Sequence, residues 1–144
     1  CLDGCEVIGA FLAQELASAG FRSMNMHQTI YVITPEFNTN GQMIFRNNHQ
    51  PAVYGKNILL LAASANTGDT LRKSLECIHY YGGIVQGISA VFSAVDKVDN
   101  NPVHSIFTAK DIPDYRSYSI GDCPMCKNKQ RLEAIVNGYG YMKL

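Results

Sequence analysis

The feature that most constrains this sequence is a strand, loop, helix and strand in that order near its middle. A continuous apolar run at Asn57–Ala63 predicts a strand buried on both faces of a sheet. Thr70–Tyr81 places apolar residues at spacings of three and four, which predicts a helix that Gly82-Gly83 ends. Ile84–Phe92 predicts the next strand. Such a βαβ unit implies an α/β fold, an open and mostly parallel sheet with helices on both faces.

Four further segments carry recognisable patterns. Glu6–Ala19 has apolar residues at helical spacing and predicts a helix. Gln28–Thr34 is β-branched and aromatic and predicts a strand, and Val103–Thr108 predicts another. The Asn- and Gly-rich stretch after the first of these strands predicts either a long loop or a ragged hairpin around Asn40-Gly41, with Met43–Phe45 as a short strand.

Composition excludes several classes of protein. Twelve Lys and Arg residues balance twelve Asp and Glu residues, so the chain lacks the positive charge of a binder of nucleic acids that relies on phosphate neutralisation. No apolar run approaches the roughly 20 residues that span a bilayer, so we expect no membrane partner. Five cysteines in 144 residues are no disulfide framework, and we expect a cytoplasmic protein. We divide the chain into an α/β core, residues 1–109, and a tail, residues 110–144, with a Cys-x-x-Cys turn.

The predicted chemistry lies where the first strand of the βαβ unit enters its helix. A turn of small and hydroxyl residues follows the strand, and the first N–H groups of a helix lack intrahelical partners. Such a junction at the carboxyl end of a parallel strand can bind phosphate, although neither a Walker A loop nor a Rossmann fingerprint is present. We expect Asp69 to cap the helix, because facing the phosphate it would repel it. The predicted phosphate-site residues are Ser64, Ala65, Asn66, Thr67, Gly68, Asp69 and Thr70.

The segment Lys56–Leu71 resembles the phosphoribosyl-diphosphate motif of type I phosphoribosyltransferases. In that family an apolar strand runs into two acidic residues, two further residues and Thr-Thr-Gly-Gly-Thr-Leu, and Asn66–Leu71 stands at those last positions. Tyr54-Gly55-Lys56 before the strand and Gly82–Val91 after the helix also look like the family. The tail Ile112–Leu144 is similar to that of some bacterial proteins labelled as orotate-type phosphoribosyltransferases.

The resemblance implies a function and further site residues. It implies transfer of ribose-5-phosphate from phosphoribosyl diphosphate to a base, an orotate-like pyrimidine, with release of pyrophosphate, as in pyrimidine nucleotide synthesis. Mg²⁺ would clamp the diphosphate. It implies a homodimer in which a mobile basic residue reaches the pyrophosphate, and Arg46 is the candidate. The residues of the implied pyrophosphate loop are Glu6, Val7, Ile8 and Gly9.

Two departures from the family pattern qualify this interpretation. Ala62 and Ala63 stand where the family has the acidic pair that meets the ribose hydroxyls. A whole family domain also has a strand and usually helices before the Glu6 loop, and Cys1–Asp3 is too short to supply them, so we expect an N-terminally incomplete domain. The alternative function is therefore a catalytically impaired relative, a regulatory module that binds phosphoribosyl diphosphate or a nucleotide.

Cys123 and Cys126 form a Cys-Pro-Met-Cys motif with three open interpretations. It is a tight turn with free thiols, half of a structural zinc site, or a redox pair. A closed zinc site needs four ligands, and no second motif of this kind follows in the sequence. Zinc binding would make a third class of function, a zinc-stapled interaction module.

Overall fold

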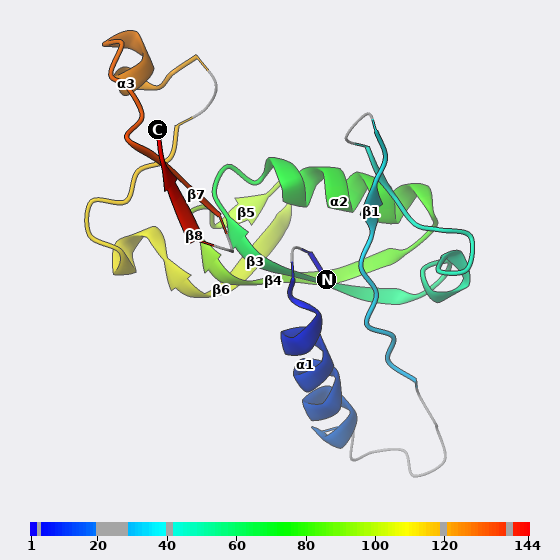
Figure 1. Ribbon diagram of the computed structural model, residues 1–144. Helices are drawn as coiled ribbons and strands as arrows, with labels where there is room; N and C mark the ends of the chain where they lie inside the picture. Colours follow the sequence, from blue (N-terminus) through cyan, green and yellow to red (C-terminus); the bar gives the residue numbers. More distant parts are fainter. Residues whose placement is uncertain (3, 20–28, 40–41, 119–120, 138–139) are drawn as a thin grey trace.

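The fold is built on a four-stranded mixed sheet (Figure 1). The computed structural model describes residues 1–2, 4–19, 29–39, 42–118, 121–137 and 140–144. Three strands run parallel, β3 (Asn57–Ala65), β4 (Ile84–Ser93) and β6 (Asn101–Thr108), in the order β3-β4-β6. The short β5 (Lys97–Val98) adds an antiparallel edge to β6. The structure therefore confirms an α/β protein with a mostly parallel sheet.

The predicted βαβ unit is present as β3, α2 (Asp69–Tyr80) and β4. The apolar stripe of α2 is buried against the sheet, as its helical spacing requires. Gly82 ends the helix with φ +73°, a conformation that favours glycine. At Gly83 a Cβ would lie 2.6 Å from Cδ1 of Ile58 and 2.7 Å from Cγ2 of Ile78, so the glycine lets the chain re-enter the sheet closely.

The two faces of the sheet are covered unequally. Leu60, Ala62, Ile88 and Ala90 belong to the buried core that α2 closes on one face. Helix α1 (Glu6–Ala19) lies on the other side, below the sheet in Figure 1, whereas α2 lies above it. The helix bounds agree with the prediction, but the expected apolar face of α1 is mostly exposed.

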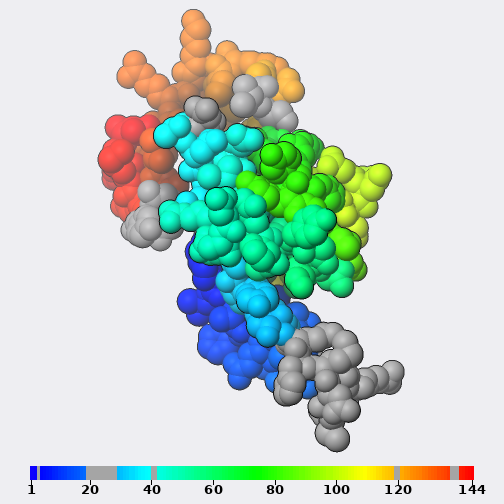
Figure 2. Space-filling view, turned by 90° about the vertical axis from the view of Figure 1, so that its right-hand side faces the viewer, coloured from blue at the N-terminus to red at the C-terminus, as the bar shows by residue number. Residues whose placement is uncertain are grey.

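Helix α1 meets the sheet only through its first turns. A Cβ at Gly9 would lie 3.1 Å from Cγ1 of Val32 and 3.7 Å from Cδ2 of Leu61, which places this glycine against β3. Further along, Phe11 is 66% exposed and Leu16 is 50% exposed. In Figure 2 α1, in blue, stands out below the body of the molecule. A parallel sheet normally has both faces covered, so this face differs from the expected arrangement.

Two extended segments continue the sheet beyond β3 without forming strands. The Leu2 N–H donates to the Leu61 carbonyl at 2.8 Å, and the Cys1 amino group donates to the Ile33 carbonyl at 2.7 Å. The predicted strand Gln28–Thr34 is wrong in its described part, because residues 29–34 carry no strand; Gln28 lies outside the described residues. Strand propensity alone therefore does not decide the conformation of this segment.

A small hairpin packs beside α2. Strands β1 (Glu36–Phe37) and β2 (Met43–Ile44) pair antiparallel, which confirms the predicted hairpin, although its Asn40-Gly41 turn lies outside the described residues. Met43 is buried, and its carbonyl accepts a hydrogen bond from the Cys77 thiol of α2 at 3.5 Å. The 3-10 turn η1 (Gln50–Ala52) then leads to β3.

The tail leaves the sheet through a capped turn. In η2 (Ala109–Asp111) the Asp111 carboxylate accepts from the Thr108 N–H at 2.7 Å, and this bond lowers the pKa of Asp111. The one-turn helix α3 (Pro124–Lys127) follows, and then the antiparallel pair β7 (Ala134–Asn137) and β8 (Gly140–Lys143). No helix among the described residues is long and apolar enough to cross a membrane.

Candidate functional site

The predicted phosphate segment joins β3 to α2 through a left-handed glycine. Ser64 and Ala65 still belong to β3, whereas Asp69 and Thr70 begin α2, so the loop proper is Asn66–Gly68. Gly68 is the N-cap residue with φ +83° and ψ −1°. A Cβ there would lie 2.9 Å from Cγ2 of Val98. Backbone conformation and close packing both require glycine at this position.

The loop lies at the carboxyl edge of all three parallel strands. Ala65 of β3 is in register with Ser93 of β4, and Ser93 is in register with Thr108 of β6. Open α/β sheets place their ligands at this edge, and the N-terminal end of α2 adds partial positive charge to it. The structure thus places the predicted residues at the edge of the sheet where open α/β folds have their ligand sites.

The charges around the loop differ from the prediction. Asp69 occupies the first helical position and does not act as N-cap, so the predicted capping role is wrong. Its carboxylate accepts a hydrogen bond from the Thr67 hydroxyl at 3.0 Å and forms an ion pair with Arg72 at 3.0 Å. Arg72 also donates to Asp99 at 3.3 Å, and this hydrogen bond is the main reason why the pKa of Arg72 is raised. Among the described residues, the ion-paired groups at this loop are the carboxylates of Asp69 and Asp99 and the guanidinium of Arg72.

A tyrosine from the tail reaches the loop, which the sequence did not reveal. The Tyr115 hydroxyl donates to Oδ1 of Asn66 at 2.6 Å. Its ring lies edge-on to Phe92 of β4, with 5.0 Å between centroids and 69° between planes. The chain between β6 and α3 therefore holds one residue of the candidate site in place. The two partners lie 49 residues apart in sequence, so no local pattern signals the contact.

Replacing Tyr115 with Phe is expected to loosen the loop while the ring contact stays. The lost hydrogen bond should lower the free energy of unfolding by about 1 kcal/mol, measured by urea denaturation. Tyr118→Phe is the control, because Tyr118 forms no hydrogen bond or ring contact in the part of the chain that the structure describes. Equal effects of the two substitutions would show that the Asn66 bond does not stabilise the fold.

The two alanines at the end of β3 differ in environment. Ala62 is 2% exposed and packs in the core beneath α2, whereas Ala63 points to the opposite face and is half-buried. A restored pair of carboxylates would therefore not be equivalent, and only position 63 could carry a charge near solvent. Neither alanine offers a ligand for the implied Mg²⁺, and Asp69 is engaged by Arg72. The residues at this edge therefore do not fit a magnesium site.

The implied pyrophosphate-loop residues form the first turn of α1. Glu6 begins the helix and accepts a hydrogen bond from the Thr34 hydroxyl at 3.1 Å. Val7 and Ile8 are exposed, and the Gly9 N–H donates to the Cys5 carbonyl at 2.7 Å. The preceding turn at Gly4, with φ +76°, is thus the true loop between the extended start of the chain and this helix.

The remaining predicted site residues have other partners. Arg46 pairs with Glu36 across the β1–β2 hairpin, with 2.6 Å between Nε and Oε1. Cys123 precedes α3 and Cys126 lies within it. Among the described residues no group of three or more His, Cys, Asp or Glu side chains converges as a metal site. The zinc interpretation stays a prediction with two ligands.

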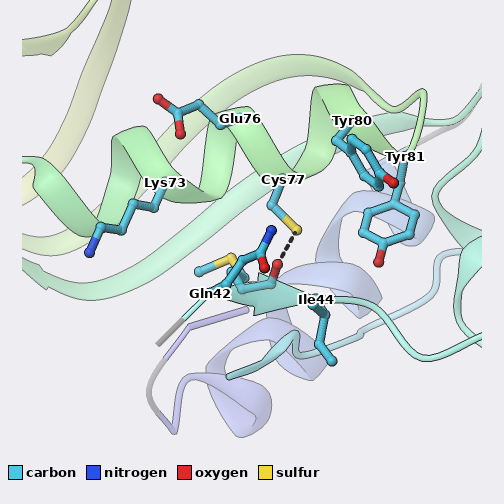
Figure 3. Close-up of a pocket in the computed structure, with 8 residues that line it drawn as sticks. Gln42, Ile44, Lys73, Glu76, Cys77, Tyr80 and Tyr81 are labelled. Carbon is cyan, nitrogen blue, oxygen red and sulfur yellow. Dashed lines mark hydrogen bonds between the residues drawn. The ribbon is translucent and has the colours of Figure 1, made fainter. Parts of the chain in front are cut away.

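Two cavities lie away from the phosphate loop. The first, of about 710 Å³, lies between the β1–β2 hairpin and α2, and Figure 3 shows Cys77 directed toward the hairpin while Glu76 points away from it. The second, of about 650 Å³, is a largely apolar groove between α1, residues 29–35 and β3. Neither cavity is lined by the residues of the loop Asn66–Gly68.

Comparison with known proteins assigns the chain to no family. No protein-family model matches the chain, and no curated protein is significantly similar to it in sequence.

Proposed function

We propose that the chain is a phosphoribosyltransferase-type protein that binds phosphoribosyl diphosphate at the β3–α2 junction. The observation that carries the proposal is the left-handed Gly68 between a buried parallel strand and the start of a helix. The residues Asn66–Leu71 of this junction are those that resemble the family motif. A base, orotate-like in the first instance, would be the acceptor of ribose-5-phosphate. We also propose that the protein is a homodimer and that it is cytoplasmic.

The 5′-phosphate would lie over the first turn of α2. Backbone N–H groups at the start of a helix donate to anions, and the helix dipole favours negative charge there. The exposed hydroxyl groups of Ser64, Thr67 and Thr70 can add donors from the same edge. Gly68 itself is buried against Val98, and its left-handed backbone sets the turn that leads to the exposed residues Asp69 and Thr70 at the start of the helix.

Asp69 is expected to weaken phosphate binding. Its exposed carboxylate lies at the first position of α2, next to the loop, and its charge is only partly neutralised by Arg72. Asp69→Asn should therefore tighten binding of ribose 5-phosphate about two- to fivefold, because a unit charge a few ångströms away in water is worth roughly 1 kcal/mol. Isothermal titration at low salt measures the change, which added salt should diminish.

Glu76→Gln is the matched control for that substitution. It removes the same charge from the exposed side of α2, seven residues further along, or about 10 Å by helix geometry. Its effect on affinity should be smaller than that of Asp69→Asn. Equal effects would mean that the gain reflects net charge alone and that Asp69 does not face the phosphate.

A second candidate function is a regulatory module without transfer activity. Ala62 and Ala63 favour it, since a methyl group accepts no hydrogen bond from a ribose hydroxyl and stabilises no charge on the sugar. The second candidate therefore shares the phosphate site and differs in turnover.

An assay of pyrophosphate release separates the two functions. The protein is mixed with phosphoribosyl diphosphate, Mg²⁺ and each of several bases, orotate among them. Release that depends on a base supports the transferase, whereas binding of the ligand without release supports the regulatory module. Absence of both binding and release would contradict the proposal.

A further inference from the structure

The two cysteines of the tail lie on one helical turn. The Cys123 carbonyl accepts a hydrogen bond from the Lys127 N–H at 3.1 Å, which closes the turn that holds Cys126. Residues three apart in such a turn have Cα atoms about 5 Å apart, by helix geometry. A disulfide needs a Cα separation of about 4.4–6.8 Å. Residues 123 and 126 can therefore be bridged with little movement of the backbone.

The pair is also the most accessible thiol group among the described cysteines. Cys126 is exposed, Cys123 and Cys1 are partly exposed, and Cys5 and Cys77 are buried, so Cys123 and Cys126 are the accessible thiols that lie close together in sequence. Helix α3 stands away from the sheet in Figure 1, so a reaction partner can approach it. The neighbouring Met125 is 47% exposed, and the Lys127–Asp122 ion pair at 3.7 Å lies on the surface as well.

The two thiols are not equivalent. The pKa of Cys123 is lowered, mainly by the backbone N–H of Cys126 and then by the Cys126 thiol, with smaller help from Met125 and Lys127. The pKa of Cys126 is raised, because its thiol donates to Cys123 and faces its charge. This asymmetry makes Cys123 the more readily deprotonated thiol of the pair and therefore the one expected to attack first.

We propose that Cys123 and Cys126 form a redox-active dithiol that exchanges with small disulfides. The Cys123 thiolate attacks one sulfur of the small disulfide, forms a mixed disulfide and releases one thiolate. Cys126 then loses its proton to solvent and attacks Sγ of Cys123, which releases the second thiolate. The protein loses two electrons and two protons to form the Cys123–Cys126 disulfide, and the small disulfide is reduced to two thiols. The site is independent of the proposed phosphate site.

The test uses the full chain, reduced, treated with a chelator and equilibrated with increasing ratios of oxidised to reduced glutathione. We expect intact mass to fall by two hydrogens and peptide mapping to place the disulfide between Cys123 and Cys126. Cys126→Ser should retain glutathione on Cys123, and Cys123→Ser should react at least about tenfold more slowly. Because the turn is exposed, circular dichroism of both variants should match that of the unmodified protein.

Any one of four results would overturn the proposal. The pair stays reduced even in oxidised glutathione alone, or the disulfide forms with another cysteine. The two single variants react at the same rate. Zinc that resists the chelator protects both thiols, which would select the zinc interpretation.

Discussion

Replacing Ala62 with Asp is expected to destabilise the fold by about 3–5 kcal/mol, the cost of an uncompensated buried charge. Ala62 is 2% exposed in the core that α2 covers, and no cation lies among the buried side chains that the structure describes. Urea denaturation followed by circular dichroism measures the loss. A domain of marginal stability would unfold. An acidic residue at the first acidic position of the family motif would therefore destabilise this protein.

The adjacent Ala63→Asp is the matched control. It introduces the same residue one position later in β3, on the opposite and more exposed face. Its expected cost is about 1 kcal/mol, from the poor strand propensity of Asp. A loss at position 63 as large as that at position 62 would contradict the two environments. If Ala63→Asp also tightens binding of a ribose phosphate, that position faces the ligand.

Gly68→Ala is expected to abolish most of the phosphate affinity. The new Cβ would meet Val98 and would hold a left-handed backbone that L-residues disfavour by roughly 1–2 kcal/mol. The loop would shift and withdraw backbone donors from the ligand. Loss of one charge-assisted hydrogen bond, worth about 1.5–3 kcal/mol, corresponds to a ten- to hundredfold weaker affinity for ribose 5-phosphate by titration.

Gly55→Ala controls for the strain of a positive φ. Gly55 has φ +66°, and a Cβ there would have no atom within 4 Å. It precedes β3 at the end of the strand opposite Gly68. Gly55→Ala should therefore cost stability without changing affinity. If both variants bind equally well, the loop at Gly68 is not the phosphate site.

Local patterns predicted the elements that depend on neighbours in sequence. The apolar run of β3, the helical spacing of α2 and the glycines at 82 and 83 identified the βαβ unit to within one or two residues. The α1 bounds followed from the same spacing. The Asn- and Gly-rich sequence between the two short strands indicated the β1–β2 hairpin. In each case the physical cause lies within about ten residues of chain.

Contacts between distant segments were beyond such patterns. Residues 29–34 have strand-forming side chains but form no strand, so local propensity did not decide their conformation. Spacing in α1 predicted an inner face but not that the sheet leaves most of it uncovered. Local patterns did not predict the hydrogen bond from Tyr115 to Asn66 or the ion pair between Asp69 and Arg72. The sequence located the loop between β3 and α2, whereas the partners of its side chains were not predicted.

Isothermal titration with phosphoribosyl diphosphate and with ribose 5-phosphate tests the central claim most directly. The proposed phosphate-binding junction lies beside two alanines, so the ribose of phosphoribosyl diphosphate would have no acidic pair to orient it. We predict that both ligands bind the unmodified protein with affinities within about tenfold of each other, a difference of about 1.4 kcal/mol, and that Gly68→Ala weakens both. No binding of either ligand, or binding that Gly68→Ala leaves unchanged, would contradict the account.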